Sequence, residues 1–123
     1  MLELEHYPIA IANAAHTVND LEATLNNLKI RIASSENAVN AEVAFDLTLK
    51  NELQRTTRRH ELLMADDVYP DLTKQVNRLS YEKASALAHL EQLRNEFSVA
   101  KLQARQEIAQ QLTSLEVREL VGI

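Results

Sequence analysis

One short run of the chain, Arg55-Thr-Thr-Arg58-Arg59-His60, gathers the side chains best suited to bind an anion. Residues three and four apart share one face of a helix, so its three arginines would form a single basic surface. We expect Arg78 to lie close to them in the folded chain. Because guanidinium groups bind phosphates and carboxylates in two-point geometry, this surface predicts contact with nucleic acid or with an acidic protein.

The alternative interpretation of this surface is a solvated helix face whose arginines pair with neighbouring carboxylates. Two observations favour it. No aromatic residues interleave with the arginines, whereas proteins that bind single strands stack bases on such rings. The whole chain carries a net charge of −5, although residues 50–83 are less acidic than their flanks, and a general nucleic-acid binder is basic.

Groups that could bind a metal or perform catalysis are sparse. Glu3 and His6 form the only Glu-x-x-His pair, whereas a di-iron bundle needs this pair on two helices together with further carboxylates. His60 begins no His-Glu-x-x-His motif. The single glycine, Gly122, excludes a glycine-rich phosphate loop, and the lack of cysteine excludes thiolate sites and cysteine nucleophiles. We therefore predict no catalytic site, no metal and no cofactor, and a protein that is not an enzyme.

The scaffold that positions these residues is predicted to consist of long helices. One glycine and two prolines leave few tight turns, while residues that favour helices, such as Ala, Leu, Glu and Gln, are abundant. No stretch approaches the roughly 18 consecutive apolar residues of a membrane span. Glu3 and Glu5 make the first residues acidic, unlike a secretory signal. We expect a soluble, cytoplasmic protein that does not contact a membrane.

Apolar residues recur at alternating steps of three and four along two stretches, which is the spacing of a seam between packed helices. The first seam begins at Val18 and the second at Leu72. Folding the chain about Val68 brings the seams together, with Phe97 opposite Val39. We therefore predict an all-α fold, a long antiparallel helical hairpin of the coiled-coil type. Its predicted core residues are Leu28, Ile32, Val39, Val43, Leu90, Leu93, Phe97 and Ile108.

The turn of this hairpin is predicted from capping residues. A pair of aspartates precedes Pro70, which fits the first turn of a helix. We therefore place the turn near 66–70, within a hairpin that comprises residues 18–123. Residues 1–17 form a separate N-terminal segment, which is a short helix, extends the first helix, folds back or is exchanged between chains.

Further apolar residues lie off the two seams. Exposed apolar patches of this kind usually mark an interface, and the alternative is scattered surface aliphatic residues, which are normal. We predict self-association into a four-helix bundle or a larger helical oligomer, or docking against a larger partner. The candidate interface residues are Ala38, Ala41, Phe45, Leu49, Leu87 and Leu102.

Parts of the stretch from Lys50 to Arg105 carry a resemblance to known proteins. They are Lys50-Asn-Glu-Leu-Gln-Arg, the aspartate-rich turn before Tyr69, and Leu93-Arg-Asn-Glu-Phe-Ser-Val-Ala-Lys-Leu102. In these blocks the chain resembles small helical proteins of uncharacterised function that phages and integrated mobile elements encode, often among replication and recombination genes. The resemblance implies a phage-type origin and work beside a DNA-handling protein, and it transfers no catalytic residues.

The functional prediction is a non-enzymatic assembly or adaptor protein that self-associates through helical faces and presents one end to a partner. The alternative is an accessory factor for nucleic-acid handling in recombination or replication. Its contact residues would be Arg55, Arg58, Arg59 and Arg78.

Overall fold

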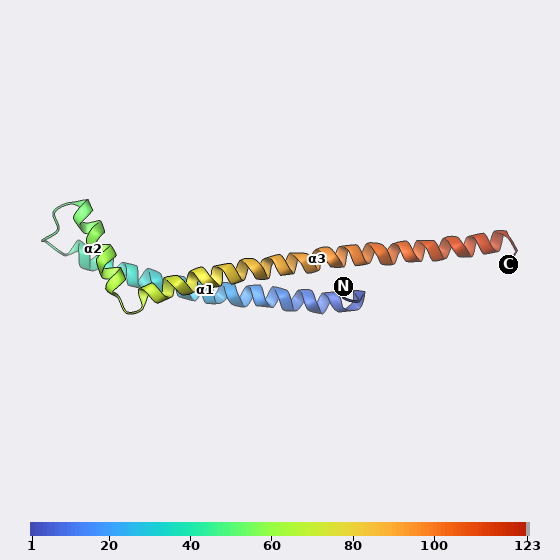
Figure 1. Ribbon diagram of the computed structural model, residues 1–123, viewed down its shortest axis with the longest axis horizontal. Helices are drawn as coiled ribbons and strands as arrows, with labels where there is room; N and C mark the ends of the chain where they lie inside the picture. Colours follow the sequence, from blue (N-terminus) through green and yellow to red (C-terminus); the bar gives the residue numbers. More distant parts are fainter. Residues whose placement is uncertain (123) are drawn as a thin grey trace. The chain divides into compact units, whose positions relative to one another are not determined.

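The computed structural model describes residues 1–122, and helices make up nearly all of this range (Figure 1). The elements in chain order are the 3₁₀ turn η1 (Leu4–His6), α1 (Tyr7–Ala44), α2 (Glu52–Ala65) and α3 (Tyr69–Leu120). No β-strand occurs within residues 1–122, which confirms the predicted all-α fold. The chain divides into two compact units: unit 1 combines Met1–Thr17 with the chain from Ala86 onward, and unit 2 is Val18–Ser85.

In unit 2, α1 and α3 lie side by side and run in opposite directions (Figure 1). Two contacts define this direction. Glu22 of α1 faces Lys83 of α3, and Glu36, further along α1, faces Tyr69 at the start of α3. The buried apolar side chains of unit 2 lie between these polar contacts and on either side of them along α1. They are Val18, Leu25, Leu28, Val39, Val43 and Leu72.

The first helix ends at Ala44, earlier than the sequence pattern suggests. Asp46 stabilises the break, because its carboxylate accepts hydrogen bonds from the backbone N–H of Thr48 at 2.9 Å and from the hydroxyl of Thr48 at 2.6 Å. Asn51 then caps α2 by accepting a hydrogen bond from the N–H of Gln54 at 2.9 Å. The predicted hairpin has two long helices joined by one turn. The structure instead interrupts the chain twice, between α1 and α2 and again between α2 and α3.

Between α2 and α3 the helical conformation is interrupted at residues 66–68. α2 ends at Ala65 and α3 begins at Tyr69. The carboxylate of Asp66 accepts a hydrogen bond from the N–H of Val68 at 3.3 Å. Pro70 lies in the first turn of α3, where its missing N–H leaves no helical hydrogen bond unmade.

In unit 1, the beginning of α1 packs against the middle of α3 (Figure 1). The buried side chains of this unit are Tyr7, Ala14, Leu90 and Leu93. From Arg105 onward every described residue of α3 is exposed. Ile108 was expected in the core, but 57% of it is accessible to solvent, because the α3 seam is covered only as far as Ala104.

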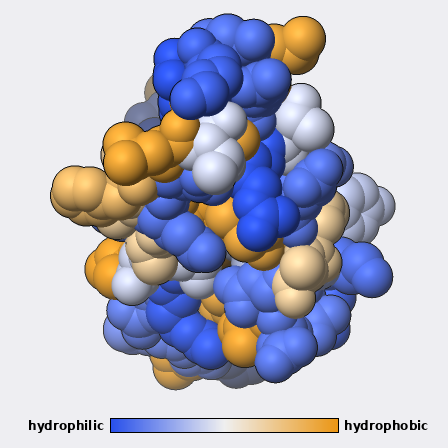
Figure 2. All heavy atoms as spheres, turned by 90° about the vertical axis from the view of Figure 1, so that its left-hand side faces the viewer, coloured by the Kyte–Doolittle hydropathy of each residue, from blue (hydrophilic) through white to orange (hydrophobic). Residues whose placement is uncertain are grey.

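The face shown in Figure 2 is mostly polar. Viewed from the side on which α2 lies, hydrophobic side chains form separate spots within a largely hydrophilic surface (Figure 2). Within residues 1–122, no helix combines the length and the apolar content that crossing a membrane requires.

Candidate interaction sites

The three arginines of the predicted basic surface all lie on α2 and are engaged by glutamates of the same helix. Glu52 holds two of them, with one carboxylate oxygen 3.2 Å from Nε of Arg55 and the other 3.1 Å from Arg59. Arg58 pairs with Glu61 at 3.3 Å. These hydrogen bonds, first that of Arg59 and then that of Arg55, hold the pKa of Glu52 below its usual value.

Arg78 lies on another helix, α3, where it faces Glu82 at 3.9 Å. Every one of the four arginines therefore has a carboxylate neighbour from its own helix. Exposed pairs of this kind contribute little to stability, because solvent screens them. They can open for a ligand, but they compensate the positive charge that would attract one.

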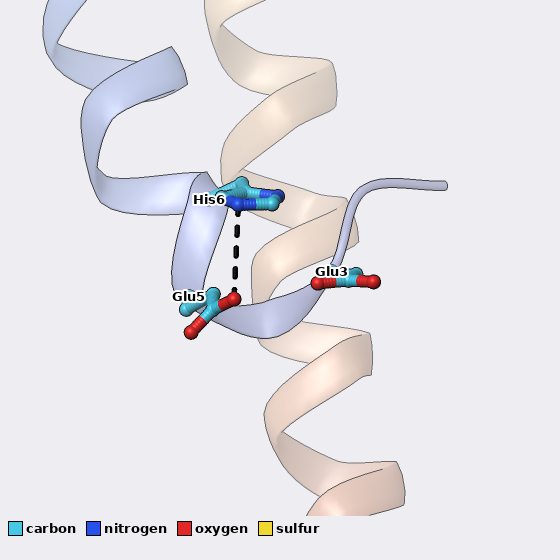
Figure 3. A group of neighbouring side chains, drawn as sticks. All are labelled: Glu3, Glu5 and His6. Carbon is cyan, nitrogen blue, oxygen red and sulfur yellow. Dashed lines mark ion pairs between the residues drawn. The ribbon is translucent and has the colours of Figure 1, made fainter.

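The N-terminal acidic group consists of Glu5 and His6 in η1 and of Glu3 just before it (Figure 3). Glu3, Glu5 and His6 can bring one ligand atom each within 4.8 Å of one another. All three side chains are exposed, and His6 lies 3.7 Å from a carboxylate oxygen of Glu5. Such a solvated cluster lacks the enclosing polar shell that fixes metal ligands, so its geometry is that of an ordinary surface contact between a histidine and a carboxylate.

The predicted core residues differ in burial. Leu28, Val39, Val43, Leu90 and Leu93 are buried, Ile32 and Phe97 are half-buried, and Ile108 is exposed. Their partners also differ from those expected. Phe97 was placed opposite Val39 but stacks on Tyr7. The spacing indicates the correct apolar faces of the helices. The register of α3 against α1, however, differs from the predicted register by many helical turns.

The predicted interface residues are mostly exposed in the single chain. Phe45, at 83%, is among the most accessible large side chains and lies just beyond the end of α1. Leu49, in the connection to α2, is partly covered. The exposed members are Ala38, Ala41, Phe45, Leu87 and Leu102.

An aromatic cluster at the start of α1 was not identified from the sequence. Tyr7 is fully buried, and its ring stacks on that of Phe97 with centroids 5.5 Å apart. Its hydroxyl donates a long hydrogen bond of 3.4 Å to Glu96 and accepts one from the N–H of Leu2 at 3.2 Å. Lys101 places its ammonium 4.5 Å from the centre of the Phe97 ring, which is within cation–π range.

The start of α3 repeats this arrangement. Tyr69, like Tyr7, is the first residue of its helix and precedes a proline. Its hydroxyl donates a hydrogen bond of 3.3 Å to Glu36 of α1. Burial, followed by the negative charge of Glu36, raises the pKa of Tyr69 above its usual value. The repeated Tyr-Pro pair is the sequence signal that could have identified both contacts.

A polar residue interrupts the α3 seam at Lys83. Its ammonium lies 3.8 Å from the carboxylate of Glu22 on α1, and its side chain is only partly exposed. A lysine at a seam position can cover the core with its aliphatic stem while its charge reaches water. The contact with Glu22 adds a cross-helix partner, which links one position of α1 to one position of α3.

Three apolar side chains continue the α3 seam where no other helix covers it. Ile108, Leu112 and Leu115 follow Ala104 at steps of four, four and three, and 57%, 56% and 53% of each is accessible. Residues at this spacing share one face of a helix. We name these three residues the apolar stripe.

Comparisons of the chain with protein-family models, with curated proteins and with solved structures give no match. The resemblance to phage-encoded helical proteins therefore stays a prediction.

Proposed function

We propose that this protein is a non-enzymatic assembly protein whose helical faces bind further copies of the chain. The observation that carries the proposal is the apolar stripe. The same seam is buried at Leu90 and Leu93 and exposed at Ile108, Leu112 and Leu115. Burying a large aliphatic side chain is worth about 1.5–3 kcal/mol, so covering the stripe with another helix would be favourable.

The polar chemistry of the chain supports the same role. The four arginines of the predicted basic surface are paired with glutamates, and the acidic N-terminal group is solvated. Seam residues placed on an exposed helix are typical of a surface that docks on another helix. An assembly or adaptor protein needs such a surface and needs no pocket for chemistry.

The proposal is tested by light scattering after gel filtration over a wide range of protein concentration. We expect a discrete oligomer whose mass falls towards that of one chain on dilution. Replacing Leu112 by Glu should shift the protein to the single-chain mass, because a charge would be buried in the contact.

Val117 offers a matched control, since it lies in the same segment with a similar accessibility of 52% but on the opposite face of the helix. Val117→Glu should leave the mass unchanged. A wild-type protein that stays a single chain at every concentration would contradict the proposed function.

A further inference from the structure

The apolar stripe belongs to a longer row of residues with an ordered distribution of charge. Steps of four and three connect six positions of α3, all of them exposed. The row begins with two basic residues, continues with the apolar stripe and ends with an acidic residue. Its members are Lys101, Arg105, Ile108, Leu112, Leu115 and Glu119.

This row continues the α3 seam that α1 covers in unit 1. Lys101 follows Phe97 by one helical turn and contacts its ring. The covered part of the seam ends at Ala104. A helix that binds the row would therefore continue an existing helix–helix interface and would repeat its packing geometry.

A second copy of the same row fits it when the two helices run in opposite directions. With Ile108 of one chain opposite Leu112 of the other, the two-fold symmetry of a dimer repeats the pair. The same register places Arg105 opposite Leu115, and Lys101 opposite Glu119. The basic beginning of each row therefore lies against the acidic end of the other, over about 27 Å of helix.

The parallel arrangement lacks this complementarity. It would place Lys101 against Lys101, Arg105 against Arg105 and Glu119 against Glu119, and like charges opposed across helices are unfavourable. Nucleic acid would meet Glu119 and the apolar stripe, neither of which binds phosphate. Of the three partners compared, an antiparallel copy, a parallel copy and nucleic acid, only the antiparallel copy matches both the apolar centre of the row and its two charged ends.

We infer that the row from Lys101 to Glu119 is an antiparallel dimerisation site, which a second copy of this chain occupies with Ile108 against Leu112. The inference rests on the proposed function and specifies its partner, direction and register. In this dimer each chain contributes one Lys101 and one Glu119, which form two equivalent pairs. A single charge reversal in the sequence therefore changes two contacts in the dimer.

The test uses charge reversal at the two ends of the row, with dimer dissociation measured by analytical ultracentrifugation at low salt. Glu119→Lys should weaken the dimer about tenfold or more, because two attractive pairs become repulsive. Lys101→Glu should do the same. The doubly reversed chain, with both substitutions, should dimerise like the wild type.

Mixing the two single variants provides a second readout. One variant then carries two acidic ends and the other two basic ends, so the mixture should form heterodimers while neither variant dimerises well alone. Glu119→Lys is the safer variant, since Lys101 also contacts Phe97 within its own chain. Glu107→Lys, a charge reversal on the same helix but off the row, is the matched control and should change dissociation less than about twofold.

The outcomes separate the inference from the proposed function. A wild-type oligomer that Glu119→Lys and Lys101→Glu leave unchanged would overturn the antiparallel site and leave self-association standing. A double variant as weak as the single ones would also overturn the pairing. A wild-type protein that never associates would overturn both.

Discussion

The ring of Tyr7, at the first residue of α1, stacks on the ring of Phe97 in α3, with 5.5 Å between centroids and 20° between planes. This contact places the beginning of α1 at one position of α3. It also determines how far α1 covers the apolar seam of α3, which is exposed from Arg105 onward. The apolar stripe is therefore a direct consequence of where Tyr7 packs.

Replacing Tyr7 by Ala should lower the free energy of unfolding by about 3–5 kcal/mol, as for other buried aromatic residues. Tyr7 is fully buried, and its truncation removes both the stacking and the hydroxyl contact with Glu96. Chemical denaturation followed by circular dichroism measures the change. Tyr81→Ala is the control, because Tyr81 is 76% accessible. This substitution should change the free energy of unfolding by less than about 0.5 kcal/mol.

Phenol ionisation should destabilise unit 2 at high pH through Tyr69. Burial and the Glu36 carboxylate raise the pKa of Tyr69 in the folded chain, whereas the unfolded chain has the usual value of about 10. The contribution of Tyr69 is thus fully present below pH 10 and is lost as the pH rises through the raised pKa. Denaturation curves at increasing pH, compared with Tyr69→Phe, measure this loss.

Glu36→Gln separates the two causes of that shift. Removing the carboxylate charge should lower the pKa of Tyr69 but leave it above the usual value, because burial is the larger cause. The ultraviolet absorbance of tyrosinate, with Tyr69→Phe to assign the titrating group, reports it. A pKa of Tyr69 that Glu36→Gln does not move would show that the charge of Glu36 does not act on Tyr69 in solution.

The stabilisation from the pairing of Glu52 with Arg59 and Arg55 on α2 should be lost in acid. The pKa of Glu52 is lowered chiefly by its hydrogen bond with Arg59 and then by that with Arg55, so its stabilisation is present above the usual glutamate pKa and is lost as the pH falls through the lowered value. In Arg59→Gln the pKa of Glu52 should rise, as measured by carboxyl chemical shifts. Arg58 pairs with Glu61 instead, so Arg58→Gln should leave the pKa of Glu52 unchanged.

Lys83→Leu should raise the free energy of unfolding by about 1 kcal/mol. The ion pair with Glu22 is partly exposed and worth little, while a leucine would complete the apolar seam of α3. Thermal unfolding by calorimetry measures the gain. Lower stability in Lys83→Leu would mean instead that the cross-helix pair contributes more than apolar burial at this position.

The basic face of α2 should bind single-stranded DNA weakly, because Glu52 and Glu61 compensate its arginines. Fluorescence anisotropy with a short labelled strand at low salt measures this. The decisive comparison is a variant with Arg55, Arg58 and Arg59 replaced by Glu. Tight, salt-dependent binding that this variant abolishes would favour the nucleic-acid alternative over assembly.

Local spacing was enough to predict much of the fold. Steps of three and four identify the apolar faces of α1 and α3 whatever they pack against, and most of those residues are buried or half-buried. The turn before Pro70 follows from local capping chemistry. Asn51 and Gln54, three residues apart, carried a similar signal for the start of α2, since each side chain accepts a backbone hydrogen bond there.

The sequence by itself therefore determined that this protein is helical and which faces of its long helices are apolar. Only the tertiary structure decided which turn of α1 meets which turn of α3, and so which apolar residues stay open. The physical reason is that a repeating seam fits its partner almost equally well after sliding by a whole repeat. Register is set by a few contacts between residues far apart in the chain, those of Tyr7 with Phe97, Tyr69 with Glu36, and Lys83 with Glu22.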